Sequence, residues 1–224
     1  MVDIRTIKPR WLEQMAEWNR ILLEEVYSRE EPDESIVAFL GSFRSTKKNA
    51  RGLDLACGAG RHAVYMARLG FETHGADIAL AGLRLTRDRL KKQNIHGYLV
   101  KYDMKHLPYT GSCFDVVICF HAVYHQKLKE IQESLSEIHR VLRKEGATIV
   151  NFLSKRTYSY AKGSQIEENT FMEEEGSEKG VLHHFTDKEE LERLFAIFKI
   201  ISIDLHEKEV EGKLRSRWIV NATV

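Results

Sequence analysis

The sequence lacks the features that direct a chain to a membrane or to nucleic acid. No apolar run approaches the roughly 20 residues that span a bilayer, and no N-terminal signal peptide is recognisable. Basic and acidic residues number 34 and 33, so the net charge of +1 creates no global field that attracts nucleic acid or an anionic membrane. We therefore expect a soluble, cytoplasmic protein that binds neither.

Cysteine is also scarce. Cys57, Cys113 and Cys119 are odd in number and lack C-x-x-C spacing, which argues against disulfides and against a structural metal site. The 224 residues include 43% hydrophobic ones and can bury one sizeable core. We therefore expect a single domain over residues 1–224, and we detect no internal repeat. The oligomeric state stays open, a homo-oligomer included.

Short apolar runs alternate with amphipathic helical patterns from Arg51 onward. This alternation predicts an α/β fold whose mostly parallel sheet is covered on both faces. One helix is expected over residues 127–144, stopped by Gly146, and another opens with a capping box from Thr186 to Glu189. A charged, glycine-containing turn at 207–213 predicts a final hairpin. The strands are expected near residues 51–56, 72–77, 97–102, 114–120, 147–153, 199–205 and 215–224.

A glycine turn between two of these elements is the most informative motif. The strand that contains Asp54 runs into Gly58 and Gly60, and the next strand ends at Asp77. Glycine lets a ligand approach the backbone closely, and the helix N-terminus that follows favours an anionic group. Asp77 follows Gly60 by about seventeen residues, where an acid accepts hydrogen bonds from ribose hydroxyls. The motif predicts a nucleoside-binding half-site.

Two ligand classes fit this half-site. Gly58, Gly60 and Ala63 match a dinucleotide fingerprint, which would make the protein a nicotinamide-dependent oxidoreductase. Asp54 argues against that alternative, because a dinucleotide fold places an apolar residue there, and a carboxylate should face something cationic. Asp54 could instead accept backbone N–H bonds from the glycine turn.

The order of Asp54, Gly58 and Gly60 resembles motif I of class I S-adenosylmethionine-dependent methyltransferases, written D/E-x-G-x-G-x-G, with Ala56 in place of the first glycine. The resemblance extends over residues 48–224 and implies a Rossmann-like, seven-stranded sheet with an antiparallel C-terminal hairpin. It implies S-adenosyl-L-methionine as cofactor and S-adenosyl-L-homocysteine as product. The cofactor-binding residues that it implies are Asp54, Gly58, Gly60, Arg61, Asp77, Ile78, Asp103, Met104 and the backbone of Phe120. Asp103 before a methionine also suits a turn.

His121 follows the fourth predicted strand, next to the expected position of the transferable methyl group. With an ordinary pKa near 6.5, it is our candidate general base. An alternative treats His121, His125 and the pair His183–His184 as metal ligands on converging loops. No carboxylate lies at close spacing in the sequence, so we expect no metal, and packing or capping is the favoured role of His125.

The acceptor is expected to be a small molecule. His184–Phe185 together with Arg215, Arg217 and Trp218 loosely resembles the tellurite-resistance and thiopurine methyltransferases. The Asn-Pro-Pro-Tyr type of signature for methylation of base amines is missing after the fourth strand, where Cys119-Phe120-His121-Ala122 stands. A non-catalytic S-adenosylmethionine-binding protein is the main alternative.

Two segments flank the predicted acceptor side. Trp11, Met15, Trp18, Leu22 and Val26 recur at helical spacing, and residues 36–43 predict a second short helix. Residues 1–47 would then form a helical cover, either over the substrate side of the cofactor pocket or over a sheet face. Residues 154–184 form a long polar segment, which is either a lid or a disordered connection.

Overall fold

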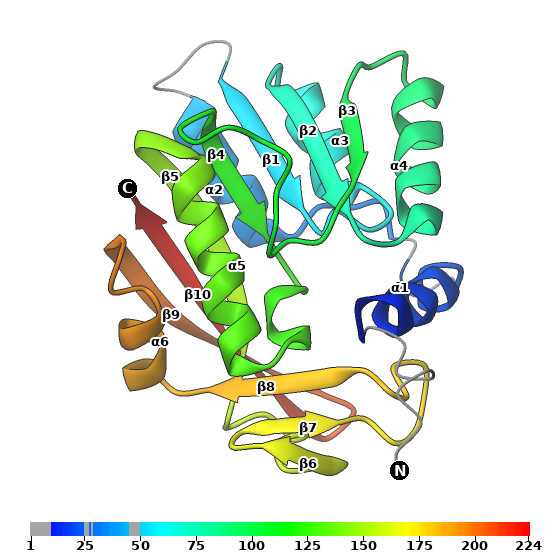
Figure 1. Cartoon of the computed structure of the whole chain (residues 1–224), viewed down its shortest axis with the longest axis vertical. Coiled ribbons are helices and arrows are strands. Elements are labelled where there is room, and N and C mark those ends of the chain that lie inside the picture. Colours follow the sequence, from blue (N-terminus) through cyan, green and yellow to red (C-terminus); the bar gives the residue numbers. More distant parts are fainter. Residues whose placement is uncertain (1–9, 25–26, 28, 45–49) are drawn as a thin grey trace, which may run out of the picture.

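A mixed sheet forms the centre of the molecule, seen in a computed structural model that describes residues 10–24, 27, 29–44 and 50–224 (Figure 1). Its parallel part has the order β3-β2-β1-β4-β5, and antiparallel β10 and β9 continue it beyond β5. These strands confirm the predicted α/β fold with its C-terminal hairpin. Their bounds are β1 Arg51–Leu55, β2 Glu72–Asp77, β3 Tyr98–Lys101, β4 Phe114–Cys119, β5 Leu142–Ser154, β9 Lys199–Val210 and β10 Lys213–Thr223.

Helices cover both faces of the sheet, as the buried residues of β4 show. Val117 and Cys119 belong to the core cluster that holds the apolar stripe of α5 (Leu128–Val141) and of α6 (Lys188–Leu194). Val116 and Ile118 belong to the opposite cluster, with side chains from α2 (Glu34–Arg44) and α3 (Arg61–Arg68). A strand buried on both faces reads as a continuous apolar run, which is why the sequence predicted β4 well.

Two predicted helix ends were wrong. The helix expected over 127–144 ends at Val141, because Leu142 is extended and already pairs with Phe114 of β4. The predicted capping box at Thr186 is displaced by one residue. Asp187 is the N-cap of α6, and its side chain accepts a hydrogen bond from the main-chain N–H of Glu190. Periodicity places a helix reliably, but its first and last residues depend on local partners.

The segment 154–184 is neither a plain loop nor disordered. It contains β6 (Ser164–Glu167) and β7 (Thr170–Met172), and β8 (Leu182–Thr186) ends it. β7 pairs with both β6 and β8 in antiparallel fashion, and β8 joins the end of β5 in parallel. Short polar strands without strict alternation give no clear period in the sequence, so they were missed.

The two N-terminal helices lie in different places, one on a sheet face and the other beside α4. α2 buries Ile36 and Leu40 against a sheet face. α1 (Arg10–Ile21) instead lies beside α4 (Leu80–Lys92) and the turn before β8, where Arg20 donates to the carbonyl of Ser177. Val26, the last residue of the predicted stripe, lies outside the described residues.

Two findings bear on the environment of the protein. Within the described ranges, every helix is too short or too polar to cross a bilayer. Cys57, Cys113 and Cys119 are buried free thiols.

Candidate active site

The glycine turn connects β1 to α3, and its backbone takes conformations that suit glycine. Gly58 and Gly60 have φ of 51° and 81°. Ala56, which stands where the motif has its first glycine, has φ of 57°, a left-handed conformation that is unfavourable for a residue with a Cβ. The Thr86 hydroxyl of α4 donates to the Gly58 carbonyl at 2.9 Å. This hydrogen bond therefore fixes the glycine turn to α4.

Gly60→Ala is expected to destabilise the protein and to abolish high-affinity cofactor binding. A Cβ at Gly60 would lie 2.4 Å from the Thr86 hydroxyl oxygen, so the turn must move in addition to adopting an unfavourable φ, which alone costs about 1–2 kcal/mol. Urea unfolding measures the stability, and titration with S-adenosylhomocysteine measures binding.

Gly70→Ala is the matched control. Gly70 also has a positive φ, of 84°, but nothing lies within 4 Å of a Cβ there. This variant should lose only the part of the free energy of unfolding that comes from the unfavourable φ. Its cofactor affinity should stay at the wild-type level. Equal losses in the two variants would contradict the view that the contact with Thr86 shapes the turn.

Asp54 and Asp77 come together at this turn. β1 and β2 are neighbours in register, with Asp54 opposite Gly75 and Leu55 opposite Ala76. Both carboxylates are buried, with exposed fractions of 2% and 6%. Asp77 accepts hydrogen bonds from the main-chain N–H groups of Gly58 and Ala79, at 2.8 and 2.7 Å. Asp77 is thus an acceptor for the glycine turn, while Asp54 accepts a hydrogen bond from the main-chain N–H of Ala63 in α3.

Asp54 is the less satisfied of the two acids. Its Oδ2 is buried and has no hydrogen-bond partner among the described residues. Burial raises the pKa of Asp54 to about 7, against the opposing effects of the Ala63 N–H and the Arg61 charge. Burial also raises the pKa of Asp77 to about 6. A buried carboxylate oxygen without a partner is costly to ionise unless a cation or a hydrogen-bond donor pairs with it.

The other predicted cofactor residues surround the same sheet edge. Asp103 and Met104 follow β3, and Asp103 accepts a hydrogen bond from the N–H of Lys105 at 3.0 Å, as in the turn that was the alternative. Ile78 follows Asp77 and is half-buried. Phe120 is buried at the end of β4. Arg61 begins α3, where burial lowers its pKa although the charges of Asp33 and Asp54 oppose this.

His121 is held at the end of β4 by partners that sequence analysis missed. Its φ is 59°, and its N–H donates to Asn151 Oδ1 of β5. Asn151 Nδ2 then lies 3.2 Å from His121 Nδ1, so the amide donates and Nδ1 carries the lone pair. Nε2 faces Asp33 Oδ2 at 3.9 Å, and Tyr124 OH lies 3.4 Å from Nδ1. Strain in such a position is typical of functional residues.

Burial sets the charge state of His121. It lowers the pKa of this ring to about 4, although Asp33 acts in the opposite direction. The imidazole is therefore neutral at pH 7, and the pKa lies below the ordinary value that the sequence analysis assumed. The His121 ring, 3.9 Å away, in turn holds the pKa of Asp33 well below its usual range. Asn151 had a sequence signal, a lone amide in an apolar strand, whereas Asp33 had none beyond its position before α2.

α1 and the residues that follow it pack against the glycine turn between β1 and α3. Ideal Cβ atoms at Gly58 and Gly82 would lie 3.3 and 2.9 Å from methyl groups of Leu22. Asn19 Oδ1 accepts a hydrogen bond from the N–H of Ala81, in the first turn of α4. The segment that contains α1 therefore covers the glycine turn.

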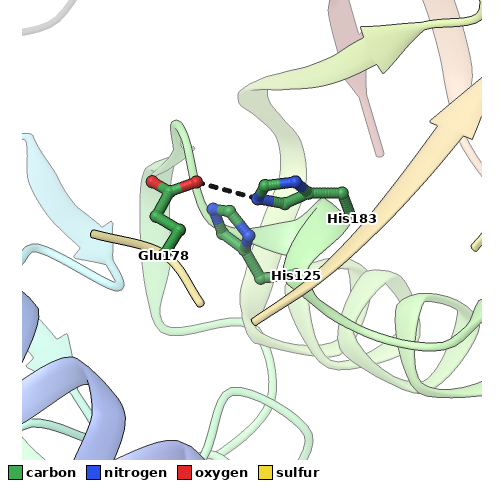
Figure 2. A group of neighbouring side chains, drawn as sticks. All are labelled: His125, Glu178 and His183. Atoms are coloured by element: carbon green, nitrogen blue, oxygen red, sulfur yellow. Dashed lines mark ion pairs between the residues drawn. The ribbon is translucent and has the colours of Figure 1, made fainter. Parts of the chain in front are cut away.

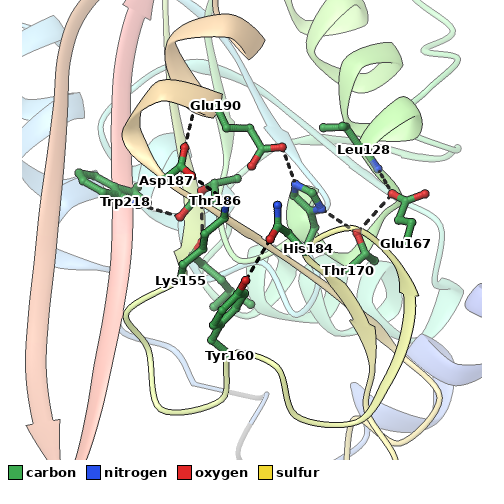
Figure 3. A network of polar contacts seen from close by, with 12 residues as sticks. Leu128, Lys155, Tyr160, Glu167, Thr170, His184, Thr186, Asp187, Glu190 and Trp218 are labelled. Carbon is green, nitrogen blue, oxygen red and sulfur yellow. Dashed lines mark hydrogen bonds and ion pairs between the residues drawn. The ribbon is translucent and has the colours of Figure 1, made fainter.

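The remaining histidines separate into two groups. His125 and His183 lie together with Glu178, and His183 Nε2 is 2.8 Å from Glu178 Oε2 (Figure 2). His184 points away into a buried network, where Nδ1 meets the Thr170 hydroxyl at 2.7 Å and Nε2 meets Glu190 at 3.3 Å (Figure 3). This network anchors the β6–β8 segment to α5 and α6, because Glu167 accepts hydrogen bonds from both Thr170 and the N–H of Leu128.

Comparisons with known proteins agree with this geometry. Residues 53–146 match a family model described as a methyltransferase domain. A ubiquinone biosynthesis O-methyltransferase of Ruegeria pomeroyi is 31% identical over 116 residues, which make up 50% of this chain and 44% of that protein. The chain spans about half the length of the curated relatives it matches.

Solved structures share the whole fold at low sequence identity. An S-adenosylmethionine-dependent methyltransferase of Methanosarcina mazei has a TM-score of 0.71 and 20% identity, covering 86% of this chain and 98% of that one. The 1,6-didemethyltoxoflavin-N1-methyltransferase of Burkholderia thailandensis, solved with 1,6-didemethyltoxoflavin and S-adenosylhomocysteine, has a TM-score of 0.70 and 16% identity. It covers 99% of this chain, and this chain covers 92% of it.

Proposed function

We propose that the protein is a class I methyltransferase that transfers a methyl group from S-adenosylmethionine to a small-molecule acceptor, since residues 53–146 match a methyltransferase-domain model. One observation carries the proposal: Asp54 and Asp77 are both buried at the glycine turn, and Asp54 Oδ2 has no partner among the described residues. A cationic nucleoside derivative matches this pair, because one acid can face a positive charge and the other can face ribose hydroxyls.

The cofactor supplies an electrophilic methyl group, and the protein positions the reactants. Holding the acceptor in near-attack geometry can lower the barrier by about 7–11 kcal/mol. In this assignment Asp54 faces the positive charge of the cofactor's methionine part. Asp77 binds the ribose of the cofactor, and Arg61 binds its methionine carboxylate. The remaining cofactor contacts are assigned to Gly58, Gly60, Ile78, Asp103, Met104 and the backbone of Phe120.

His121 is assigned as the general base. Its neutral ring carries a lone pair at Nδ1, where Asn151 and Tyr124 lie. The proton that an acceptor hydroxyl or amine loses would move to this nitrogen after the acceptor has displaced the Asn151 amide from it. The imidazolium that forms would face Asp33 through Nε2–H. A base is needed only for an acceptor that arrives protonated.

A small acceptor is favoured by the balanced charge of the chain, because a net charge of +1 creates no global attraction for nucleic acid. The relative from Ruegeria pomeroyi is named for ubiquinone biosynthesis, and the neighbour from Burkholderia thailandensis is named for methylation of 1,6-didemethyltoxoflavin. The buried free thiols favour a reducing, cytoplasmic location.

Isothermal titration with S-adenosylhomocysteine, combined with turnover of S-adenosylmethionine on a panel of hydroxylated and amino-substituted ring compounds, tests the proposal. We expect cofactor binding and release of S-adenosylhomocysteine with at least one acceptor. Binding without turnover on any acceptor would favour a non-catalytic S-adenosylmethionine-binding protein. Stabilisation by NAD but not by S-adenosylhomocysteine would favour an oxidoreductase.

Asp77→Ala is expected to weaken S-adenosylhomocysteine binding by about 5- to 150-fold, which corresponds to about 1–3 kcal/mol for lost hydrogen bonds. Asp88→Ala serves as the control, because Asp88 lies on α4 with 69% of its side chain exposed. Thermal unfolding of both variants separates a binding defect from unfolding. Unchanged affinity in a folded Asp77→Ala protein would refute the ribose assignment.

A further inference from the structure

His125, Glu178 and His183 form a cluster of potential metal ligands outside the proposed cofactor contacts. One donor atom from each lies within 4.8 Å of the others. The three come from separate segments: a short 3₁₀ helix (Val123–His125), the turn before β8, and β8 itself (Figure 2). Their convergence is a product of the fold, since Glu178 lies 53 positions after His125 in the sequence.

We propose that this cluster binds a divalent transition-metal ion, with Zn²⁺ as the representative probe. Two imidazoles and one carboxylate are a donor set used for such ions, and three protein ligands leave a coordination position open. The proposal goes beyond methyl transfer, because it concerns metal binding by residues that the proposed reaction does not use.

The orientation of the rings supports the proposal. His125 Nδ1 lies 3.0 Å from the carbonyl of Leu182, so Nδ1 carries the proton and Nε2 presents a lone pair to the cluster. His183 has Nδ1 3.8 Å from Glu173 Oε2, while its Nε2 faces Glu178. Metal-ligating histidines commonly direct their second nitrogen to a carbonyl or carboxylate in this way.

Glu178 is fixed by the N-terminal segment. Tyr27 OH donates to Glu178 Oε1 at 3.0 Å and lies 2.9 Å from the hydroxyl of Ser177. Oε2 remains directed at His183. An outer partner of this kind orients a carboxylate ligand and contributes to metal affinity.

The site is also secluded. His125 is 7% exposed, and the side chains of His183 and Glu178 are 12% and 26% exposed. Trp18 packs edge-on against the His125 ring at 4.8 Å. In such surroundings water competes little for the ion, and Glu178 supplies the negative charge that partly neutralises it.

The distances fit with a small adjustment. A tetrahedral ion at about 2.0–2.2 Å from each ligand requires donor atoms about 3.3 Å apart. His183 Nε2 and Glu178 Oε2 are 2.8 Å apart, and the widest separation is at most 4.8 Å. Side-chain rotation closes the difference, and the ion takes the place of the proton that joins His183 to Glu178.

The sequence predicted no metal site because no carboxylate lies near these histidines in the sequence. In the fold, the turn before β8 places Glu178 next to His125 and His183. Of the other proposed ligands, His121 faces Asp33 and His184 lies in the network of Figure 3.

The test uses the full-length, tag-free protein after dialysis against a chelator. Competition titration should show uptake of one Zn²⁺ per chain, with a higher thermal midpoint, and Co²⁺ should give the visible absorption of a low-symmetry, four- or five-coordinate site. Glu178→Gln and His183→Gln should each weaken Zn²⁺ binding by more than about 100-fold, because that is the upper range for loss of a mere outer-shell partner. Tyr27→Phe should weaken it by about 10- to 100-fold.

His206→Gln is the matched control, since His206 lies exposed on β9, and it should bind Zn²⁺ like the wild type. Tyr27→Phe keeps every ligand, so it decides the question if a ligand variant fails to fold. Absence of stoichiometric uptake by the wild type would overturn the proposal. Equal affinities of the wild type, Glu178→Gln and Tyr27→Phe would also overturn it.

Discussion

Asp54→Asn is expected to make the cofactor-free protein more stable at pH 8, by about 1–3 kcal/mol, while it weakens cofactor binding. Burial raises the pKa of Asp54 to about 7 from an ordinary value of 3.8, which corresponds to about 4 kcal/mol of destabilisation of the ionised form. The neutral amide removes this penalty. It retains a smaller one, of about 1–3 kcal/mol at most, for a buried polar group without a partner.

The direction of the pH dependence follows from the raised pKa. The folded state binds the Asp54 proton more tightly than the unfolded state, so stability is highest below the ordinary pKa and falls as the pH rises from about 4 to about 7. Asp77 contributes in the same direction, with its pKa raised to about 6. In Asp54→Asn the fall should be smaller and should end near pH 6. Urea unfolding between pH 4 and pH 8 measures both curves.

Cofactor binding should show the opposite dependence. The α-ammonium group, which S-adenosylhomocysteine keeps although it lacks the sulfonium charge, favours ionised Asp54. Wild-type affinity for this ligand should therefore rise with pH up to about 7 and then level off. Asp54→Asn should bind about 10- to 150-fold more weakly at pH 8, which is the range for hydrogen bonds to a charged group.

Two results would contradict this account. Coincident stability curves for the wild type and Asp54→Asn would mean that Asp54 carries no burial penalty. A pH-independent affinity in the wild type would mean that the ligand does not interact with the ionised acid. Asp88→Asn, an exposed change on α4, should leave both measurements unaltered.

The sequence predicted the parts of this molecule that follow a period or a motif. Strands buried on both faces, such as β4, and the helix stripe of α5 were placed correctly. The methyltransferase motif recognised from Asp54, Gly58 and Gly60 agrees with the methyltransferase-domain model that matches residues 53–146. These features are local, because each depends on residues that are close together in the chain.

The features that the sequence did not predict depend on contacts between distant residues. Asn151 and Asp33 reach His121 from β5 and from the residue before α2. Glu178 lies near His125 and His183 because it stands on the turn that joins β7 to β8. Nothing in the spacing of these residues reveals their proximity, so the surroundings of the proposed base and the proposed metal site required the fold.

His121→Asn should lower kcat by about 100- to 10,000-fold, the range for loss of a general base, with little change in S-adenosylhomocysteine affinity. Asparagine is preferable to alanine here, because the φ of 59° at this position is one that asparagine tolerates. Tyr124→Phe, which removes only the hydroxyl near Nδ1, should cause a smaller loss. A large loss of cofactor affinity in His121→Asn would mean that the side chain maintains the structure of the site.

The pH profiles should distinguish His121 from Asp54. Because burial lowers the pKa of His121 to about 4, the ring is already neutral at pH 5 and above, and kcat should show no rising limb near the ordinary histidine pKa of about 6.5. The kcat/KM for S-adenosylmethionine reports the free enzyme, so it should rise with an apparent pKa near 7 that belongs to Asp54. In His121→Asn this limb should keep its position while the plateau falls, and in Asp54→Asn it should move to about pH 6, where Asp77 titrates. A contrary result would be a rising limb in the wild-type kcat profile that is absent from His121→Asn. It would mean that the pKa of His121 is near neutrality and that Asp33 influences this pKa more strongly than burial does.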